Sequence, residues 1–305
     1  MLRNLMLRIA DSPALVGFLS RQGMKTGFAR RFVAGESLQE AIPVVEGLNS
    51  KGIKCSLDLL GEGVEDEETA RTATQSYVNL LHVIQERGVD CNISIKLTQL
   101  GLDIGRQVAA RNLKKILDAA RECGNFVRID MEGSDYTADT VELFVEHLEI
   151  YGPATVGIVI QSYLRRSEED VRRLASLGCN IRLCKGAYKE PPELAFPKKS
   201  QVDDNFVKLM EIMLASPCYS AIATHDEKMI NRAQELIERD GVDSSRYEFQ
   251  MLYGTRSEYQ EEIKNQGYRM RVYVPFGTQW APYFIRRLAE RPANVLFVLR
   301  NLFKK

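Results

Sequence analysis

Short apolar runs alternate with longer segments of helical periodicity from residue 53 onward. Eight runs rich in β-branched and large apolar residues predict strands, because such residues suit a strand packed on its neighbours. Between the runs, apolar positions recur at three- and four-residue spacing, which predicts helices. The predicted strands cover residues 53–60, 91–97, 126–132, 155–161, 180–185, 219–225, 247–252 and 270–275.

The order of these elements predicts a parallel sheet. Each predicted strand is followed by its own helix, and most strands read as continuous apolar runs, as is typical of strands buried on both faces. Eight such units over roughly 250 residues match a (β/α)8 barrel of the TIM type, in the α/β class. An open doubly wound sheet is the alternative, but no G-x-G-x-x-G follows a strand and no G-x-x-x-x-G-K-S/T is present.

No segment rich in Pro, Gly or Ser divides the chain, so residues 1–305 are predicted to form a single domain. Residues 1–45 precede the first strand and look helical, which predicts an N-terminal helical arm packed on the barrel. The last helix follows strand eight after a short loop with Pro275 and Gly277. We therefore expect this helix to lie over the barrel mouth.

Composition and charge narrow the class of protein. The chain of 305 residues is 45% hydrophobic and 27% charged, which is ordinary for a globular protein. Lys+Arg and Asp+Glu both total 41 without long blocks of one sign, so no basic surface indicates a nucleic-acid partner. Six cysteines lie far apart, with no C-x-x-C pair and no Cys/His cluster, which argues against a zinc site and a disulfide framework. A small-molecule substrate and no metal are expected.

Charged residues break the apolar character of the N-terminal segment. Arg3, Arg8 and Asp11 interrupt it before an apolar stretch reaches signal-peptide length. Elsewhere no run approaches the roughly 18 residues of a membrane span. A cytoplasmic enzyme is expected, with peripheral contact to a membrane left open.

Polar side chains mark the end of every predicted strand. In a (β/α)8 barrel these ends and the loops after them form the catalytic face. Polar residues converging there from eight strands predict an active site. The residues in question are Asp58, Glu62, Lys96, Asp130, Glu132, Gln161, Tyr163, Arg182, Lys185, Tyr188, Thr224, His225, Gln250 and Tyr273.

Each of these residues alone has a structural explanation as well. Arg182 lies inside an apolar run and could be the buried ion-pair partner of Asp130. A lone histidine such as His225 is more often a hydrogen-bonded structural residue than a catalyst. The convergence of many strand ends, rather than one residue, carries the prediction.

The final helix carries adjacent arginines, Arg286 and Arg287, with Glu290 four and three residues on. One interpretation is a solvated face with local ion pairs. The other is that two guanidinium groups lie over the barrel mouth, where they suit a substrate carboxylate.

At these residues the sequence resembles the proline dehydrogenase family. The similarity spans essentially all of the chain after residue 50, in eight ordered motifs. They are LDLLGE at 57–62, ISIKL at 93–97, RIDMEG at 128–133, IVIQSY at 158–163, IRLCKGAY at 181–188, ATHD at 223–226, YEFQMLYG at 247–254, and RVYVPFG with YFIRRLAERPAN at 271–294.

The resemblance implies a distorted (β/α)8 barrel with bound FAD that oxidises L-proline to 1-pyrroline-5-carboxylate and passes electrons to a membrane quinone. It implies catalytic roles for Asp130 and Arg182. By motif position it further implies flavin contacts at Asp130, Gln161, Arg182, Lys185, Gly186, Ala187, Thr224 and His225, and substrate contacts at Lys96, Leu252, Tyr273, Tyr283, Arg286 and Arg287.

Two positions depart from the family pattern. In KKSQVDDNF, Val202 and Phe206 stand where the family commonly has hydroxyl residues. The departure bears on how this segment positions the cofactor, and not on the reaction.

A gate is predicted between the two ends of the barrel sequence. Closing the barrel brings strands one and eight together, so Glu62 in the Gly-flanked loop after strand one is expected to pair with Arg286 on the last helix. Such a pair would exclude water from the site and open to admit substrate. The alternative is that Arg286 pairs with Glu290 on its own helix.

Two other functions compete with a flavoenzyme. Lys96 and Lys185 are lysines at strand ends, as a Schiff-base aldolase requires. A barrel that only binds a ligand is the non-catalytic alternative, against which the full ring of polar strand ends counts. The sequence leaves the oligomeric state and the identity of the quinone open.

Overall fold

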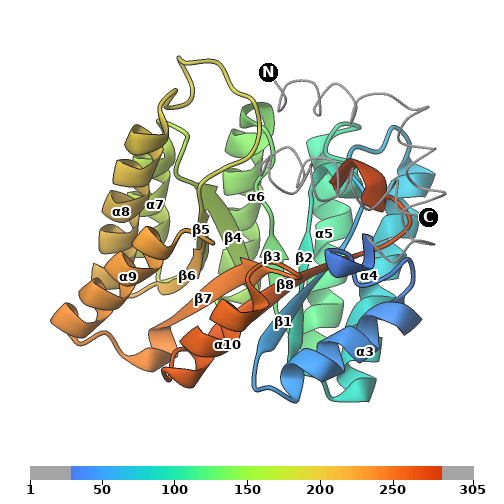
Figure 1. Cartoon of the computed structure of the whole chain (residues 1–305). Coiled ribbons are helices and arrows are strands. Elements are labelled where there is room, and N and C mark those ends of the chain that lie inside the picture. The colour runs from blue at the N-terminus through green and yellow to red at the C-terminus, as the bar shows by residue number, and fades with distance from the viewer. Residues whose placement is uncertain (1–28, 284–305) are drawn as a thin grey trace, which may run out of the picture.

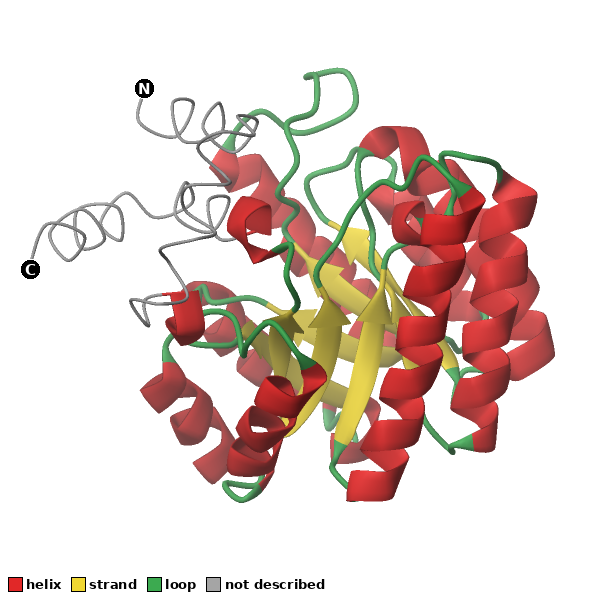
Figure 2. Ribbon diagram, turned by 90° about the vertical axis from the view of Figure 1, so that its right-hand side faces the viewer, coloured by secondary structure: helices red, strands yellow, loops and turns green. Residues whose placement is uncertain are grey.

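The computed structural model describes residues 29–283, in which eight parallel strands close into a barrel with neighbours in sequence order. Helices surround the barrel (Figure 1), and the long loops gather at the ends toward which the strands point (Figure 2). The predicted (β/α)8 barrel is confirmed, and the open doubly wound sheet is excluded. Residues 1–28 of the expected arm and residues 284–305 with the arginine pair lie outside the described residues.

The strands match the predicted order, and most of them end within one residue of the predicted C-terminal limit. The exceptions are β2, β3 and β6, which stop two or three residues early. The strands are β1 (Lys54–Leu59), β2 (Cys91–Ile95), β3 (Val127–Ile129), β4 (Val156–Gln161), β5 (Asn180–Cys184), β6 (Tyr219–Ala223), β7 (Tyr247–Leu252) and β8 (Met270–Phe276).

Side-chain hydrogen bonds to the loops begin directly after β3 and β6. Beyond β3, the carbonyl of Met131 accepts a bond from the Gln161 side chain at 3.2 Å, and Glu132 turns its carboxylate to Thr98. Beyond β6, the Thr224 hydroxyl accepts a bond from the backbone N–H of Asp226 at 3.1 Å. The Asp130 and Thr224 N–H groups still donate to Ile95 and Gln250 on the neighbouring strands, so pairing fades where the side chains begin to bond to the loops.

Helices cover the outside of the barrel, one after each of strands β1 to β7. The helices of more than one turn are α3 (Leu38–Asn49), α4 (Glu67–Arg87), α5 (Arg106–Glu122), α6 (Ser134–Tyr151), α7 (Ser167–Ser176), α8 (Lys199–Ala215), α9 (Glu227–Asp240) and α10 (Ser257–Asn265). The 3-10 helices are η1 (Ala29–Arg31), η2 (Thr98–Leu100) and η3 (Ser244–Arg246).

Helix α4 shows how the sequence sets these limits. The Asp66 side chain caps its first turn by accepting from the Thr69 N–H at 2.8 Å, and Gly88 ends it in the left-handed conformation at φ 62°. The helix buries Leu80, Leu81 and Ile84 in the main apolar core. Burial of these side chains attaches the helix to the barrel.

Helix α3 is the described part of the expected N-terminal arm. It packs against β1 and β8 and buries Ala41, Ile42 and Val45. It continues to Asn49, so the predicted boundary at residue 45 falls within the helix rather than at its end. Among residues 29–283, no helix combines the length and apolar character needed to cross a bilayer.

The protein has two buried regions, one apolar and outside the strands, the other polar and along the barrel axis. The apolar core lies between the strands and the helices and includes Leu57, Ile93 and Ile129. Inside the barrel, side chains from alternate positions of the same strands are polar, such as Ser56 and Ser94, whose hydroxyls are 3.2 Å apart. Polar groups therefore fill the axis, and the C-terminal ends of the strands present them to the mouth.

Candidate active site

Four charged residues from four strands meet at the C-terminal end of the barrel. The Lys96 ammonium lies 3.0 Å from Asp58 Oδ1, and both side chains are buried. The Arg182 guanidinium lies 2.8 Å from Asp130 Oδ1, with side-chain exposures of 6% and 13%. Burying two ion pairs side by side costs desolvation, so the fold must hold them in a fixed geometry.

The Asp130 carboxylate is the centre of this cluster. Its Oδ2 accepts a hydrogen bond from the Tyr273 hydroxyl at 2.8 Å, while Arg182 occupies Oδ1. Arg182 also donates to the Ser94 hydroxyl at 3.1 Å and lies 5.3 Å from the centre of the Tyr273 ring. Arg182 of β5 and Tyr273 of β8 thus fix the Asp130 carboxylate directly. Ser94 of β2 and the Tyr273 ring in turn hold Arg182 in place.

Burial and charge shift the pKa values of the cluster in different directions. Burial disfavours the charge on Lys96, but Asp58 and Asp130 outweigh it and hold the lysine pKa well above its ordinary value. Burial raises the pKa of Asp130, and Arg182 and Lys96 offset part of that rise. Burial, with the nearby Asp130, raises the pKa of the Tyr273 hydroxyl well above its ordinary value, so it stays a donor at neutral pH.

A third carboxyl, Glu132, supports the loop that follows β2. It accepts from the Thr98 N–H at 3.1 Å and from the Thr98 hydroxyl at 2.6 Å. Burial raises its pKa to about 7 despite these bonds. Because Lys96 lies two residues before Thr98, Glu132 helps to fix the segment that carries the lysine.

The predicted flavin contacts of this region lie at the end of β4, where Gln161 is the last residue, and in the loop after β5. The Gln161 side-chain amide donates to the Met131 carbonyl, and its buried Oε1 has no partner within the described residues. Gly186 has φ 101°, and a Cβ there would overlap the Tyr163 ring. Only glycine allows this close contact between the loop and the ring. Ala187 follows it on the exposed side of the loop.

Lys185 is held by two carboxylates that the sequence interpretation did not assign. Its ammonium lies 2.5 Å from Asp203 and 2.6 Å from Asp226, and Lys199 pairs with the same two side chains. The salt bridges join β5, α8 and the start of α9. Asp226 could have been predicted as a site residue, since it follows a strand and caps α9. Asp203 lies within a helical pattern, so nothing in the sequence indicates its contact with Lys185.

Thr224 and His225 join the ends of β6 and β7. The His225 ring Nε2 accepts from the Leu252 N–H at 2.9 Å, and its carbonyl accepts from Arg256 at 2.9 Å. Thr224 accepts from the Asp226 N–H. These contacts bring three of the predicted site residues, Thr224, His225 and Leu252, onto one connected edge of the mouth.

The remaining residues of the predicted flavin, substrate and gate contacts belong to the loop after β1 and to the end of the chain. Glu62 is exposed in that loop, although its charge still acts on Lys96. Tyr283 is buried near the end of the described residues. Arg286 and Arg287 lie outside the described residues, so the predicted gate and carboxylate clamp stay predictions.

The two departures from the family pattern lie on α8. Phe206 is fully buried in the main apolar core. The Val202 carbonyl accepts from the Ser162 hydroxyl at 3.2 Å. Phe206 therefore attaches α8 to the barrel by packing, whereas Val202 contributes a backbone hydrogen bond and packs against Tyr163, Leu164 and Ala195.

Ser56 and Ser94 were not singled out from the sequence, and Asp58 was noted only as a polar strand end, yet all three contact the central ion pairs. Ser56 and Asp58 alternate with Cys55 and Leu57 in β1, and Ser94 lies between two isoleucines in β2. This alternation of polar and apolar positions inside buried strands is the feature from which the three residues could have been predicted. It indicates side chains that point to the barrel axis.

Similarity to known proteins identifies the family of this barrel. A family model described as "Proline dehydrogenase" matches residues 41–300. The chain belongs to the proline dehydrogenase family. It is 40% identical over 305 residues to "Proline dehydrogenase 1" of Bacillus subtilis subsp. natto, covering 100% of both chains. It is 38% identical over 305 residues to "Proline dehydrogenase" of Deinococcus radiodurans, covering 99% of this chain and 98% of the relative.

Solved structures agree on the barrel. A crystal structure of proline utilization A from Bdellovibrio bacteriovorus, inactivated by N-propargylglycine, is similar with a TM-score of 0.81 and 28% identity. The match covers 86% of this chain but 32% of that one, so the chain spans about a third of the solved protein. Family membership and fold together confirm the expected enzyme class, an oxidoreductase of this family.

Proposed function

We propose that the chain oxidises L-proline to 1-pyrroline-5-carboxylate, using bound FAD as the hydride acceptor and passing the electrons to a membrane quinone. This would be the first step of proline catabolism. The observation that carries the proposal is the meeting of Lys96, Asp130, Arg182 and Tyr273 at the barrel mouth in a chain of the proline dehydrogenase family.

The substrate carboxylate is assigned to Lys96, together with Arg286 and Arg287 of the helix that the sequence predicts after β8. Lys96 is a permanent cation here because Asp58 and Asp130 hold its pKa high. A fixed ammonium fixes the carboxylate, and through it the face of the ring that is presented for oxidation. Leu252, Tyr273 and Tyr283 are proposed to form the wall against the ring.

The residues present are compatible with FAD. The buried Gln161 Oε1 lacks a partner within the described residues, as expected of an acceptor reserved for a ligand N–H. Gly186 keeps the β5–α8 loop close to Tyr163 where a side chain would clash. We propose that Asp130, Gln161, Arg182, Lys185, Gly186, Ala187, Thr224 and His225 hold the flavin, which supplies the two-electron acceptor when bound.

The chain's own groups prepare the substrate. Removal of hydride beside a secondary amine needs the amine neutral, and burial next to Lys96 and Arg182 lowers an amine pKa. Tyr273 keeps its proton because its pKa is raised, so it holds Asp130 in place without adding negative charge. Arg182 would place a positive charge beside the bound flavin, which favours acceptance of electrons there. Glu62 with Arg286 is proposed to close the site to water.

The aldolase alternative is disfavoured by the same geometry. A Schiff-base lysine must lose its proton readily, which requires a depressed pKa. The pKa of Lys96 is raised instead, and Lys185 is bound by two carboxylates. Neither lysine is prepared to act as a nucleophile.

We further propose a single domain over residues 1–305 in the cytoplasm, with peripheral contact to the inner face of the membrane where a quinone can be reached. No nucleic acid and no metal are assigned. Within residues 29–283 no group of three or more His, Cys, Asp or Glu side chains is arranged to hold a metal ion.

The decisive experiment follows the flavin spectrum of the purified full-length chain without oxygen. We expect an absorption band in the visible blue that L-proline bleaches and D-proline leaves intact. Trapping with borohydride serves as the control for aldolase chemistry and should attach no substrate to Lys96 or Lys185. A protein that carries no flavin, or whose band L-proline leaves unchanged, would reject the proposal.

A further inference from the structure

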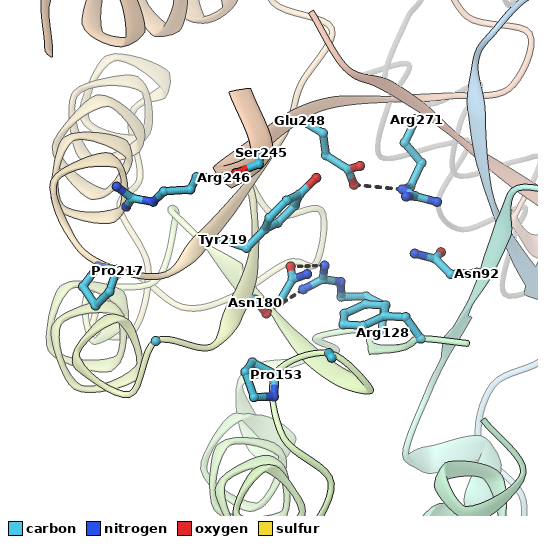
Figure 3. A pocket seen from close by; sticks show the side chains of 13 residues that line it. Asn92, Arg128, Pro153, Asn180, Pro217, Tyr219, Ser245, Arg246, Glu248 and Arg271 are labelled. Carbon is cyan, nitrogen blue, oxygen red and sulfur yellow. Dashed lines mark hydrogen bonds and ion pairs between the residues drawn. The ribbon is translucent and has the colours of Figure 1, made fainter. Parts of the chain in front are cut away.

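A second polar cluster lies at the opposite end of the barrel, where the strands begin. It surrounds a pocket of about 450 Å³ formed by the starts of strands β2 to β8 and the turns before them (Figure 3). Its charged and amide side chains are those of Asn92, Arg128, Asn180, Arg246, Glu248 and Arg271. The proposed reaction, at the other mouth, uses none of them.

The charges of this pocket do not balance. Arg271 Nε lies 2.8 Å from Glu248 Oε1, which neutralises one guanidinium. Arg128 donates to the carbonyls of Ile158 and Asn180 at 3.0 and 2.7 Å. Within residues 29–283, neither Arg128 nor Arg246 forms an ion pair, so the residues that line the pocket carry three cations and one anion, with Asp90 and Asp243 acting from outside it.

Hydrogen bonding in the pocket is also incomplete. Seven buried side-chain polar atoms lack a partner in the described residues, and four of them belong to residues that line this pocket. The four are Arg128 Nε, Arg246 Nε, Asn92 Oδ1 and Glu248 Oε2. Arg128 and Glu248 are only 1% and 2% exposed. Unpartnered buried groups are costly, so their concentration at one pocket is typical of a site that binds a polar ligand.

The environment of Arg128 indicates the sign of that occupant. Burial, together with the like charge of Arg182, lowers its pKa to about 9. A negative ligand would reverse this effect by stabilising the charged guanidinium. A cation would add to the repulsion between Arg128 and Arg271.

We propose that this pocket binds a small oxyanion, a phosphate or a carboxylate. Oxygens of such a group would accept from the unpartnered Nε–H groups of Arg128 and Arg246, whose other amino groups donate to Asn180, Ile158, Leu214 and Ser216. Guanidinium groups suit both kinds of anion. Hydrogen phosphate, or a carboxylate that also carries an O–H or N–H, would in addition donate to Asn92 or Glu248. Water alone would complete hydrogen bonds but leave the excess positive charge.

The test is calorimetric titration of the full-length chain saturated with FAD, with inorganic phosphate in one series and acetate in the other. Chloride keeps the ionic strength constant. Arg246→Gln removes a half-buried guanidinium from the pocket edge. Arg239→Gln is the matched control, since Arg239 is exposed near the end of α9 and pairs with Asp240 without lining the pocket.

We expect saturable binding of at least one anion, weakened roughly 10- to 100-fold by Arg246→Gln, which is the usual range for a lost charge-assisted hydrogen bond. Arg239→Gln should change affinity by less than about twofold. The stronger anion of the two identifies the ligand class. If Arg246→Gln does not fold, Arg246→Lys keeps the charge without the planar fork and should still weaken binding.

Several results would overturn the proposal. Absence of saturable binding of both anions would mean a pocket filled with water. Equal loss in the two glutamine variants would indicate general electrostatic attraction. Unchanged affinity in the Arg246 variants would place the anion elsewhere, including at the opposite mouth, where it would also raise the apparent KM for proline.

Discussion

Asp130 is held from several sides at the barrel mouth that we assign to the reaction. One oxygen is paired with Arg182 and the other with Tyr273, and Lys96 acts on it through space. Such a carboxylate has no freedom to rotate, so its negative charge is held at one point. At the scale of single residues, the site is defined by fixed charges rather than by a mobile acid or base.

The first prediction distinguishes a structural role from a catalytic role for the ion pair of Arg182 and Asp130. Arg182→Met leaves Asp130 as a buried charge without its partner, which should destabilise the fold by about 3–5 kcal/mol. It should also slow reduction of the flavin by proline and lower the flavin potential. Denaturant unfolding and anaerobic stopped-flow absorbance measure the stability and the reduction rate.

A double variant provides the control. Arg182→Met combined with Asp130→Asn removes the uncompensated charge while keeping a side chain that can bond to Tyr273. We expect it to regain stability but not the reduction rate. Recovery of both would assign Arg182 a structural role alone.

At the scale of elements, a loop after a strand can require a backbone conformation that only glycine adopts readily. The β5–α8 loop passes the Tyr163 ring at Gly186, in a backbone region that other residues avoid. This loop also follows Lys185, whose salt bridges tie β5 to α8 and α9. One glycine and one lysine therefore contribute to its position, together with the bonds from Ser134 to Glu190.

Gly186→Ala tests this dependence. The added Cβ would overlap the Tyr163 ring, so the loop must move, and we expect loss of flavin retention with a destabilisation of about 1–3 kcal/mol. Gly178→Ala is the matched control, because Gly178 also has positive φ, 64°, but has nothing within 4 Å of its Cβ. Flavin content after gel filtration is the measurement; equal retention in both variants would contradict the role of the ring contact.

The gate is a prediction about two elements, the loop after β1 and the last helix. Glu62→Ala should weaken proline binding and speed the reaction of reduced flavin with oxygen, because water and oxygen enter an open site. Glu65→Ala, an exposed carboxylate of the same loop, should change neither. Parent-like kinetics for Glu62→Ala, with Glu62 and Arg286 far apart in a ligand-bound structure, would remove the gate.

At the scale of the whole molecule, buried ionisable groups make stability depend on pH. The pKa of Glu132 is about 7 in the folded chain, above the ordinary value of 4.5. A raised carboxyl pKa favours folding below pH 4.5, and that contribution is lost as pH rises through 7. The loss amounts to at most about 3 kcal/mol, because a tenfold change in proton affinity corresponds to about 1.36 kcal/mol.

Glu132→Gln should therefore flatten the decline of the free energy of unfolding between about pH 5 and 8. Urea unfolding at intervals of pH measures the slope, whatever the variant does to stability at one pH. Glu149→Gln, at an exposed carboxylate, should keep the parent slope. Parallel curves for the parent and Glu132→Gln would show that this carboxyl titrates normally.

The sequence was sufficient for the barrel but not for its interior contacts. Continuous apolar runs and helical periodicity follow local rules, so strand order and most strand limits were predictable. Partners such as Asp203 for Lys185, or Ser94 for Arg182, depend on which strands are neighbours and in what register. Attention to the strand ends also left the charged strand starts, with Arg128, without an interpretation.

Pairing of β1 with β8 has a consequence for how the chain is made. Lys54 lies opposite Arg271 in this pairing, so the barrel closes only after most of the chain has been synthesised. Until then β1 and β7 each present an open edge, and open edges of parallel strands pair readily with other chains. We expect a chain shortened before β8 to aggregate rather than to fold into a smaller barrel.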